Sequence, residues 1–261
     1  MPVLTPEYVS LQGEIILHER DSSGNPLTGF WVGDANNATF KAETNETKYK
    51  ENYSGKRATA LTVENEIVTG FDFTFLQLHT KNLAELFRGE EVAQSTSAVT
   101  NKVISGDTLA VGDRLMLGAE EVSAVTIEDS TGTPKTLTAG TNYEIDLVTG
   151  RIKILDLTTG GPFVGPLKAD FTPGASNSVK LLTGVKKQFW LSLVGVNTVV
   201  SGQPKGVLDL YKFEFSLPAA FAVINDTRGE FAVSGSVLSD ALKSASGALG
   251  QIGRIQGFGI T

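Results

Sequence analysis

Apolar and polar residues alternate along most of the chain, and this two-residue period predicts β-strands. In "VLDLYKFEFSLP" three aromatic residues share one predicted face: Tyr211, Phe213 and Phe215. In "GFDFTFLQL" three more do the same: Phe71, Phe73 and Phe75. Gly, Asn, Pro and Ser residues separate such segments and mark turns. The pattern predicts a mainly β fold, a β-sandwich or partial barrel.

One segment has a helical period instead. In "HTKNLAELFRGEE" three apolar residues follow the i, i+3, i+4 spacing of a helix face: Leu83, Leu86 and Phe87. We expect a short helix over Lys81–Arg88 that packs on the sheet through these side chains. Thr80 or Asn82 would cap its start, and Gly89 would end it.

The composition changes near Glu90, where a polar, small-residue stretch leads into a different β pattern. Within it, "NYEIDLVTGRIKIL" predicts a hairpin in which Tyr143 and Ile145 meet Ile152 and Ile154. After "PGASN" the strand pattern of the first ninety residues resumes. The chain is therefore predicted to have a discontinuous core, residues 1–98 and 175–261, with a small accessory β domain, residues 99–174, inserted into it and facing outward.

The chain has 261 residues, a net charge of −7 and no cysteine. This charge argues against gripping nucleic acid through its phosphates. The N-terminus lacks a basic start and an apolar block, and no apolar run approaches the roughly 20 residues of a membrane helix. These features are typical of a soluble intracellular β protein.

The sequence contains no recognisable catalytic or cofactor motif. His18 and His79 are far apart, without the spacing of a metal site or a catalytic triad. "YSGKRA" and "GALGQIGRIQGFG" lack the spacing of phosphate-binding loops. We expect no enzyme activity, no cofactor and no metal.

The stretch "YKENYSGKRA" reads as a long polar arm between two strands. Its predicted contact residues are Thr47, Lys48, Tyr49, Lys50, Glu51, Tyr53, Gly55, Lys56 and Arg57. The charges have both signs, the tyrosines are suited to anchor an interface, and Gly55 gives the turn its backbone freedom. The arm is either a surface decoration or a segment that reaches another subunit.

The order of these segments resembles the major tail tube protein of long, flexible-tailed bacteriophages. The resemblance rests on "FKAET", then "KENYSGKRA", then Thr-rich strands, then "NLAELFRGE", and on the C-terminal strands around "VLDLYKFEFSLP". It covers about four-fifths of the chain. Each motif is weak alone, and their order and spacing carry the resemblance.

The resemblance implies a structural virion protein of the phage tail, assembled in the cytoplasm of the bacterial host. Such subunits are β-sandwiches with a flanking helix. They form rings of six with a continuous inner β-barrel, and the rings stack into a tube through which double-stranded DNA passes on ejection. The long loop reaches an adjacent subunit or ring. The implied partners are other copies of the chain, the tape measure protein, and tail terminator and tail tip proteins.

In that arrangement one face of the arm strands would line the bore. Phe40, Ala42, Val63 and Ile67 would face the core. The opposite positions would face the bore: Lys41, Glu43, Glu64 and Glu66. An acidic bore repels phosphates and lets a duplex pass. The alternative is that these carboxylates lie on an ordinary solvent-exposed strand face and have no role in a bore.

Two other classes stay open. A β-sandwich binding, adhesion or virion decoration module would expose aromatic residues on one face, whereas Trp31 and Trp190 are both predicted to lie in the core. An intracellular hydrolase would need a pocket that the sequence does not indicate.

Overall fold

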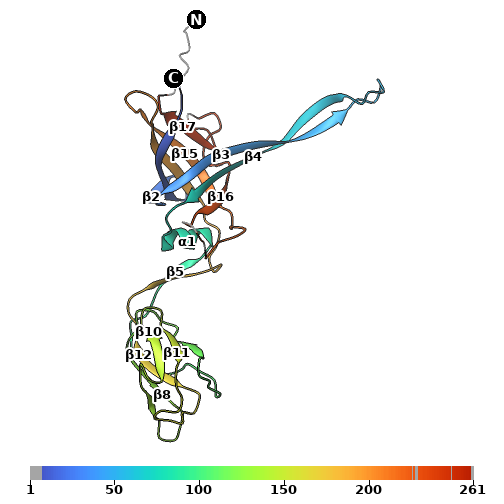
Figure 1. The fold of residues 1–261 in the computed structure, drawn as a ribbon. Coiled ribbons are helices and arrows are strands. Elements are labelled where there is room, and N and C mark those ends of the chain that lie inside the picture. The colour runs from blue at the N-terminus through green and yellow to red at the C-terminus, as the bar shows by residue number, and fades with distance from the viewer. Residues whose placement is uncertain (1–7, 225, 227–228, 248, 260–261) are drawn as a thin grey trace. The chain divides into compact units, whose positions relative to one another are not determined.

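The computed structural model describes residues 8–224, 226, 229–247 and 249–259. The chain divides into two compact units, Met1–Glu90 with Lys180–Thr261, and Glu91–Val179 (Figure 1). The predicted inserted segment, 99–174, lies within the second unit. The fold is mainly β with one short helix, as the alternating pattern predicts.

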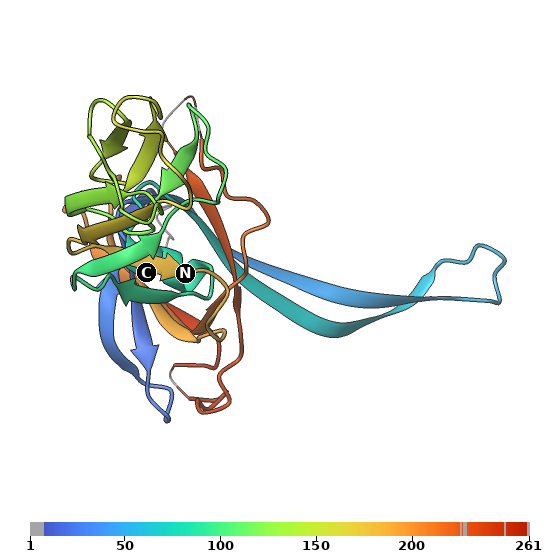
Figure 2. The same cartoon turned by 90° about the horizontal axis from the view of Figure 1, so that it is seen from below.

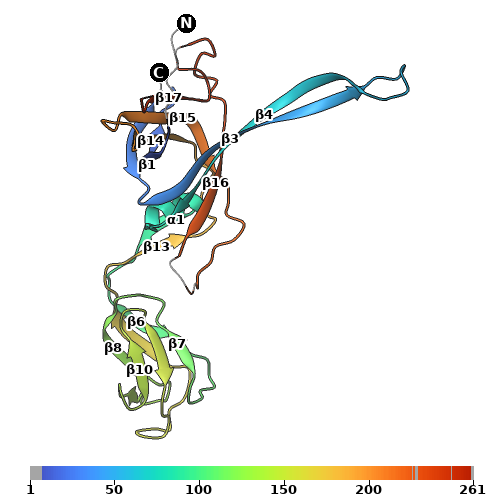
Figure 3. The same ribbon diagram turned by 45° about the horizontal axis from the view of Figure 1, so that its top comes forward.

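The first unit is built on one antiparallel sheet. Its elements are β1 (Leu11–Arg20), β2 (Pro26–Trp31), β3 (Ala35–Lys50), β4 (Thr59–Phe75), α1 (Thr80–Leu86), β14 (Phe189–Asn197), β15 (Lys205–Phe215), β16 (Phe231–Val237) and β17 (Gly253–Gly257). The strand order is β2-β1-β14-β15-β16-β4-β3, and β17 pairs with the first half of β15. In the described residues the sheet curls strongly but does not close into a barrel, because β2 and β3 remain at its two ends (Figure 3).

Aromatic residues fill the inside of the curl. The predicted set from β4 is buried together with partners from β14 and β15: Phe71, Phe73, Phe75, Phe189, Phe213 and Phe215. Their rings meet mostly edge to face or tilted, with centroids 5.0–6.4 Å apart. Each fully buried ring contributes about 2 kcal/mol of hydrophobic stabilisation.

A row of paired glycines crosses four strands of the sheet. Gly13 on β1 pairs with Gly195 on β14, Gly195 with Gly206 on β15, and Gly206 with Gly257 on β17. A Cβ on Gly195 would lie 2.2 Å from the carbonyl oxygen of Gln12. The four strands therefore approach one another more closely than residues with side chains would allow.

The helix differs from the prediction at both ends. It spans Thr80–Leu86, and its N-cap residue is His79, without a side-chain cap. Asn82 is no cap: it is buried and donates a hydrogen bond of 2.6 Å to the carbonyl oxygen of Val32. At the other end Arg88, and not Gly89, takes the left-handed conformation (φ 47°). Leu86 is buried in the core and Phe87 packs on it, whereas Leu83 is half-buried and outside that cluster.

The prediction that three aromatic residues of β15 share one face is wrong for Tyr211. The register between β14 and β15 shifts, because Leu191 pairs with Leu210 whereas Phe189 pairs with Phe213. The bulge turns Tyr211 to the outer face of the sheet, where its ring lies 4.6 Å from that of Trp190. The C-terminal segment covers this face, and the Tyr211 hydroxyl donates to the carbonyl oxygen of Leu249 at 2.6 Å.

The two predicted core tryptophans have different environments. Trp190 is buried, as predicted. Trp31 is not a core residue, because 49% of its surface is exposed. It lies at the end of β2, an edge strand with no further strand outside it in the described residues.

The second unit has its own core. Its strands are β6 (Val99–Val103), β7 (Arg114–Met116), β8 (Ser123–Glu128), β9 (Thr136–Leu137), β10 (Tyr143–Asp146), β11 (Arg151–Ile154) and β12 (Lys168–Thr172). They form one sheet in the order β10-β11-β7 and another in the order β6-β12-β8-β9. The predicted hairpin is present, with Tyr143 opposite Ile154 and Ile145 opposite Ile152. The two chain segments at the unit boundary, β5 (Glu90–Ala93) and β13 (Asn177–Lys180), pair with each other.

Candidate functional site

The longest strand pair of the molecule leaves the sheet as a two-stranded ribbon. β4 pairs with β16 only over Thr69–Phe75, whereas its pairing with β3 continues to Lys50 (Figure 1). Over residues 43–68 both edges of the ribbon are therefore unpaired within the described part of the chain. Eight residues of β3 at about 3.3 Å each carry the ribbon about 26 Å beyond its last contact with β16. Figure 2 shows the same projection from below.

The predicted polar arm is the outer part of this ribbon. Thr47–Lys50 is strand and not loop, so only residues 51–58 form the turn. The turn is held by its own hydrogen bonds: the Glu51 amide donates to the Ala58 carbonyl oxygen at 2.8 Å, and the Ser54 hydroxyl donates to the Glu51 carboxylate. Gly55 and Arg57 have positive φ. The tip is a hydrogen-bonded turn.

The ribbon exposes apolar side chains on both faces. They are Phe40, Tyr49, Tyr53, Leu61, Val63, Ile67 and Val68, each 39–91% exposed. Directly paired residues share a face, so Phe40, Ala42 and Ile67 lie on the same face as the core residue Phe71, as predicted, whereas Val63 lies on the opposite face. In the single chain these side chains are nonetheless exposed, because no second layer covers the ribbon within the described residues. An isolated two-stranded ribbon is only marginally stable in water. Its length and its exposed apolar groups favour a surface that another molecule covers.

The register separates the four residues predicted to line a bore. Asn45 pairs with Glu66, but Glu46 pairs with Glu64, so Asn65 is an extra residue in β4. Directly paired residues share a face, and consecutive residues of a strand lie on opposite faces. Lys41, Glu43 and Glu66 therefore share one face, and Glu64 lies on the other. The spacing of Glu64 and Glu66 alone predicts a common face, and the bulge overturns it.

Charges on the face of Lys41, Glu43 and Glu66 begin with an ion pair. The Lys41 ammonium donates to the Asp72 carboxylate, and this hydrogen bond raises the pKa of Lys41. Farther along the ribbon, the Asn45 side chain donates to Glu66 at 3.3 Å. Glu43 and Glu66 leave this face of the ribbon acidic.

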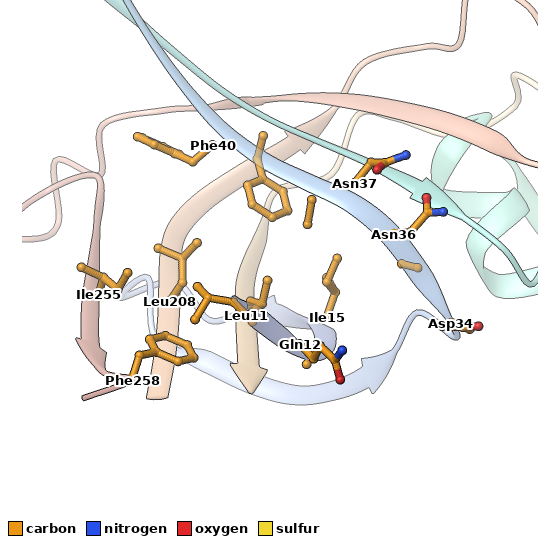
Figure 4. Close-up of a pocket in the computed structure, with 15 residues that line it drawn as sticks. Leu11, Gln12, Ile15, Asp34, Asn36, Asn37, Phe40, Leu208, Ile255 and Phe258 are labelled. Atoms are coloured by element: carbon orange, nitrogen blue, oxygen red, sulfur yellow. The ribbon is translucent and has the colours of Figure 1, made fainter. Parts of the chain in front are cut away.

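A cavity lies inside the curl of the first unit, and no pattern in the sequence predicts it. Its volume is ≈ 700 Å³, and it lies between β1, β3, β15 and β17 (Figure 4). Apolar side chains in its lining include Leu11, Phe40, Leu208, Ile255 and Phe258. Asn36 and Gln12 add polar groups, and the buried Asn36 Oδ1 accepts no hydrogen bond in the described structure.

The histidines occupy structural positions. His18 Nδ1 lies 3.0 Å from the Leu27 carbonyl oxygen, and His79 precedes the helix. In the described residues no three His, Cys, Asp or Glu side chains gather as metal ligands do. Nor is any described helix both long and apolar enough to cross a membrane.

Fold and ribbon together define an antiparallel β protein with a long projecting hairpin and an inserted β unit. The chain belongs to the family described as "Protein of unknown function UCP028589", whose model matches residues 8–256. No curated protein matches the sequence.

Proposed function

We propose that this chain is a structural protein that assembles with copies of itself into stacked rings, forming the tail tube of a bacteriophage. The observation that carries the proposal is the β3–β4 ribbon. It has two unpaired edges, exposed apolar groups on both faces, and no packing partner among the described residues of its own chain. Edge strands of this kind pair readily with another chain. The resemblance of the arm and its flanking segments to tail tube proteins supports the same assignment.

The ribbon suits head-to-tail assembly. Its tip is far from its base, so a contact between the tip of one copy and another part of the next copy uses two different surfaces. Such a contact closes into a ring or continues as a filament. On this proposal the chain is not an enzyme and needs no cofactor.

The acidic face of the ribbon suits a bore through which DNA passes without binding. Glu43 and Glu66 share that face, with Lys41 neutralised by Asp72. Carboxylates repel the phosphates of a passing duplex. Glu64 lies on the opposite face and has no place in this lining.

Electron microscopy of the purified protein tests the proposal. We expect rings or tubes with a central channel. Uniform single subunits at all concentrations, by microscopy and by sedimentation, would reject it.

The cavity supports a second candidate, a β-sandwich binding module. A space of ≈ 700 Å³ with apolar and polar lining groups has the size of a small-molecule site. A binding module would remain monomeric in the same images and would gain thermal stability from an apolar ligand.

A further inference from the structure

Charge is distributed unevenly along the ribbon. Residues 48–57 at its tip contain four basic side chains and one acidic one, a net charge of +3 on a chain of net charge −7. Lys50, Lys56 and Arg57 form no ion pair in the described structure. Nearer the base the ribbon carries four carboxylates instead: Glu43, Glu46, Glu64 and Glu66.

Two of these carboxylates face each other directly. Glu46 pairs with Glu64 across the ribbon, and like charges at paired positions destabilise a sheet. Lys48 offsets part of this repulsion through a 3.8 Å ion pair with Glu46. Glu64 has no such partner among the described residues. An additional cation on this face would reduce the electrostatic repulsion between Glu46 and Glu64 in the isolated ribbon.

An apolar side chain lies beside this pair. Ile67 pairs with Thr44, two residues before Glu46 on β3, so it shares the face of Glu46 and Glu64. It is 61% exposed. At the tip, Tyr53 is 91% exposed. The tip thus offers cations and an aromatic ring, and the base offers carboxylates and an apolar group.

Lys56 and Arg57 in the turn cannot reach these carboxylates in their own chain. The paired strand continues from Glu46 to Lys50 and directs the turn away from them. The turn begins at Glu51, five positions after Glu46 and about 17 Å away along the strand. This is about twice the distance over which salt at physiological strength screens a charge.

We propose that the tip of one copy docks on the Glu46–Glu64 face of the ribbon of a second copy. Arg57 and Lys56 pair with the two carboxylates, and the Tyr53 ring covers Ile67. The proposal rests on the proposed self-assembly and specifies its contact. The carboxylates of the other face, Glu43 and Glu66, are not part of it.

Cysteine cross-linking tests the contact, because the chain has no cysteine of its own. One tagged copy carries Arg57→Cys and an untagged copy carries Glu64→Cys. Under mild oxidation the mixture forms a disulfide-linked heterodimer only if the tip of one copy reaches the other. The matched control replaces Glu64→Cys with Glu66→Cys, which lies nearby on the opposite face. Because a disulfide requires Cα atoms within about 7 Å, we expect the reaction of Glu64→Cys to be about tenfold faster or more. Equal rates, or no cross-link in either mixture, would overturn the proposal.

Charge reversal gives an independent test. Glu46→Lys with Glu64→Lys, or Lys56→Glu with Arg57→Glu, should each raise the protein concentration needed for assembly by about tenfold or more. The four substitutions together restore opposite charges and keep the net charge at −7, so assembly should return. Glu43→Lys with Glu66→Lys, the same charge change on the other face, should leave assembly intact. Rings from every variant would refute the docking contact while leaving self-assembly standing, whereas a wild-type chain without rings would refute the proposed function itself.

Discussion

Asp209 lies on the outer face of β15, where three side chains donate hydrogen bonds to its carboxylate. Trp190 Nε1 lies 3.1 Å and Ser192 Oγ 2.6 Å from Oδ1, and Arg254 Nε lies 3.0 Å from Oδ2. Asp209 is only 5% exposed, so its charge depends on these donors. The cluster joins β14, β15 and the C-terminal strand β17.

Replacing Asp209→Ala should therefore destabilise the first unit. We expect a loss of about 2–4 kcal/mol in the free energy of unfolding, because three donors lose their acceptor and Arg254 loses its counter-charge. Asp209→Asn, which keeps one acceptor oxygen, should cost less. Both tryptophans lie in the first unit, so their fluorescence in a urea titration reports on this unit. Identical midpoints for wild type and Asp209→Ala would contradict this role.

Asp129 has the corresponding role in the second unit. Burial acts to raise its pKa, but hydrogen bonds from the Lys135 amide, the Thr131 hydroxyl and the Val164 amide outweigh burial and lower the pKa. Because the pKa is lowered in the folded state, the carboxylate stabilises the unit at pH values above the ordinary Asp pKa of about 3.9. That stability is lost as the pH falls through the depressed pKa.

The melting temperature of the second unit should thus be flat from neutral pH to about 5 and fall below about 4. Asp129→Asn should lower it at pH 7 and make it less sensitive to acid. Calorimetry of both proteins between pH 7 and about 2 measures this. The same acid dependence in wild type and variant would show that other groups, such as Asp146, whose pKa is also lowered, determine it.

At the scale of elements, the sequence pattern predicts which segments form strands, but it predicts which face a side chain takes only as far as the next bulge. Alternation in β4 and the helical period before Glu90 give the correct element types, and the buried Phe71, Phe73 and Phe75 confirm the predicted face. The errors in facing, at Tyr211 in β15 and at Val63 and Glu64 in β4, each follow from a single extra residue in the strand. A bulge depends on how two strands meet, and the period of one strand does not contain that information.

Part of the candidate site was predictable as well. The polar stretch with its two tyrosines indicated a projecting segment, but its composition does not show that Thr47–Lys50 continues the ladder. The cavity was missed because its lining comes from six strands that are spread along the sequence. The glycine row was also missed, because its members are seen to pair only once the register is known.

The glycine row predicts strong sensitivity to added side chains. Gly195→Ala places a Cβ 2.2 Å from the Gln12 carbonyl oxygen, so β1 and β14 must separate. We expect a loss of about 2–3 kcal/mol, since overpacking against backbone cannot relax through a side chain. Gly132→Ala is the matched control, because nothing lies within 4 Å of a Cβ there. Urea titrations followed by tryptophan fluorescence for Gly195→Ala, and calorimetry for both variants, measure the effect. Equal tolerance at both positions would contradict the close approach.

At the scale of the whole molecule, the second unit is separable from the first by its contacts and its own core. The two segments that lead into it pair as β5 and β13. Next to them, the backbone amide of Gln94 donates a hydrogen bond of 2.8 Å to the carbonyl oxygen of Ser176. These two residues are therefore the natural points at which to rejoin the chain.

Joining Gln94 to Ser176 through Asn-Gly should leave the first unit folded and competent to assemble, because a two-residue turn closes the existing strand pair. Tryptophan fluorescence in urea and electron microscopy measure the two properties. An insoluble or unfolded product would show that the first unit depends on the second.

The central claim is that the β3–β4 ribbon joins copies of the chain, and shortening the ribbon tests it most directly. Replacing residues 46–65 by Asn-Gly leaves Asn45 and Glu66 paired beside a two-residue turn, so the sheet of the first unit should remain intact. Sedimentation velocity of the wild type and the shortened chain is the measurement. We predict large, salt-sensitive assemblies for the wild type and a folded monomer with an unchanged urea midpoint for the shortened chain. Assemblies of equal size from both proteins would contradict the account.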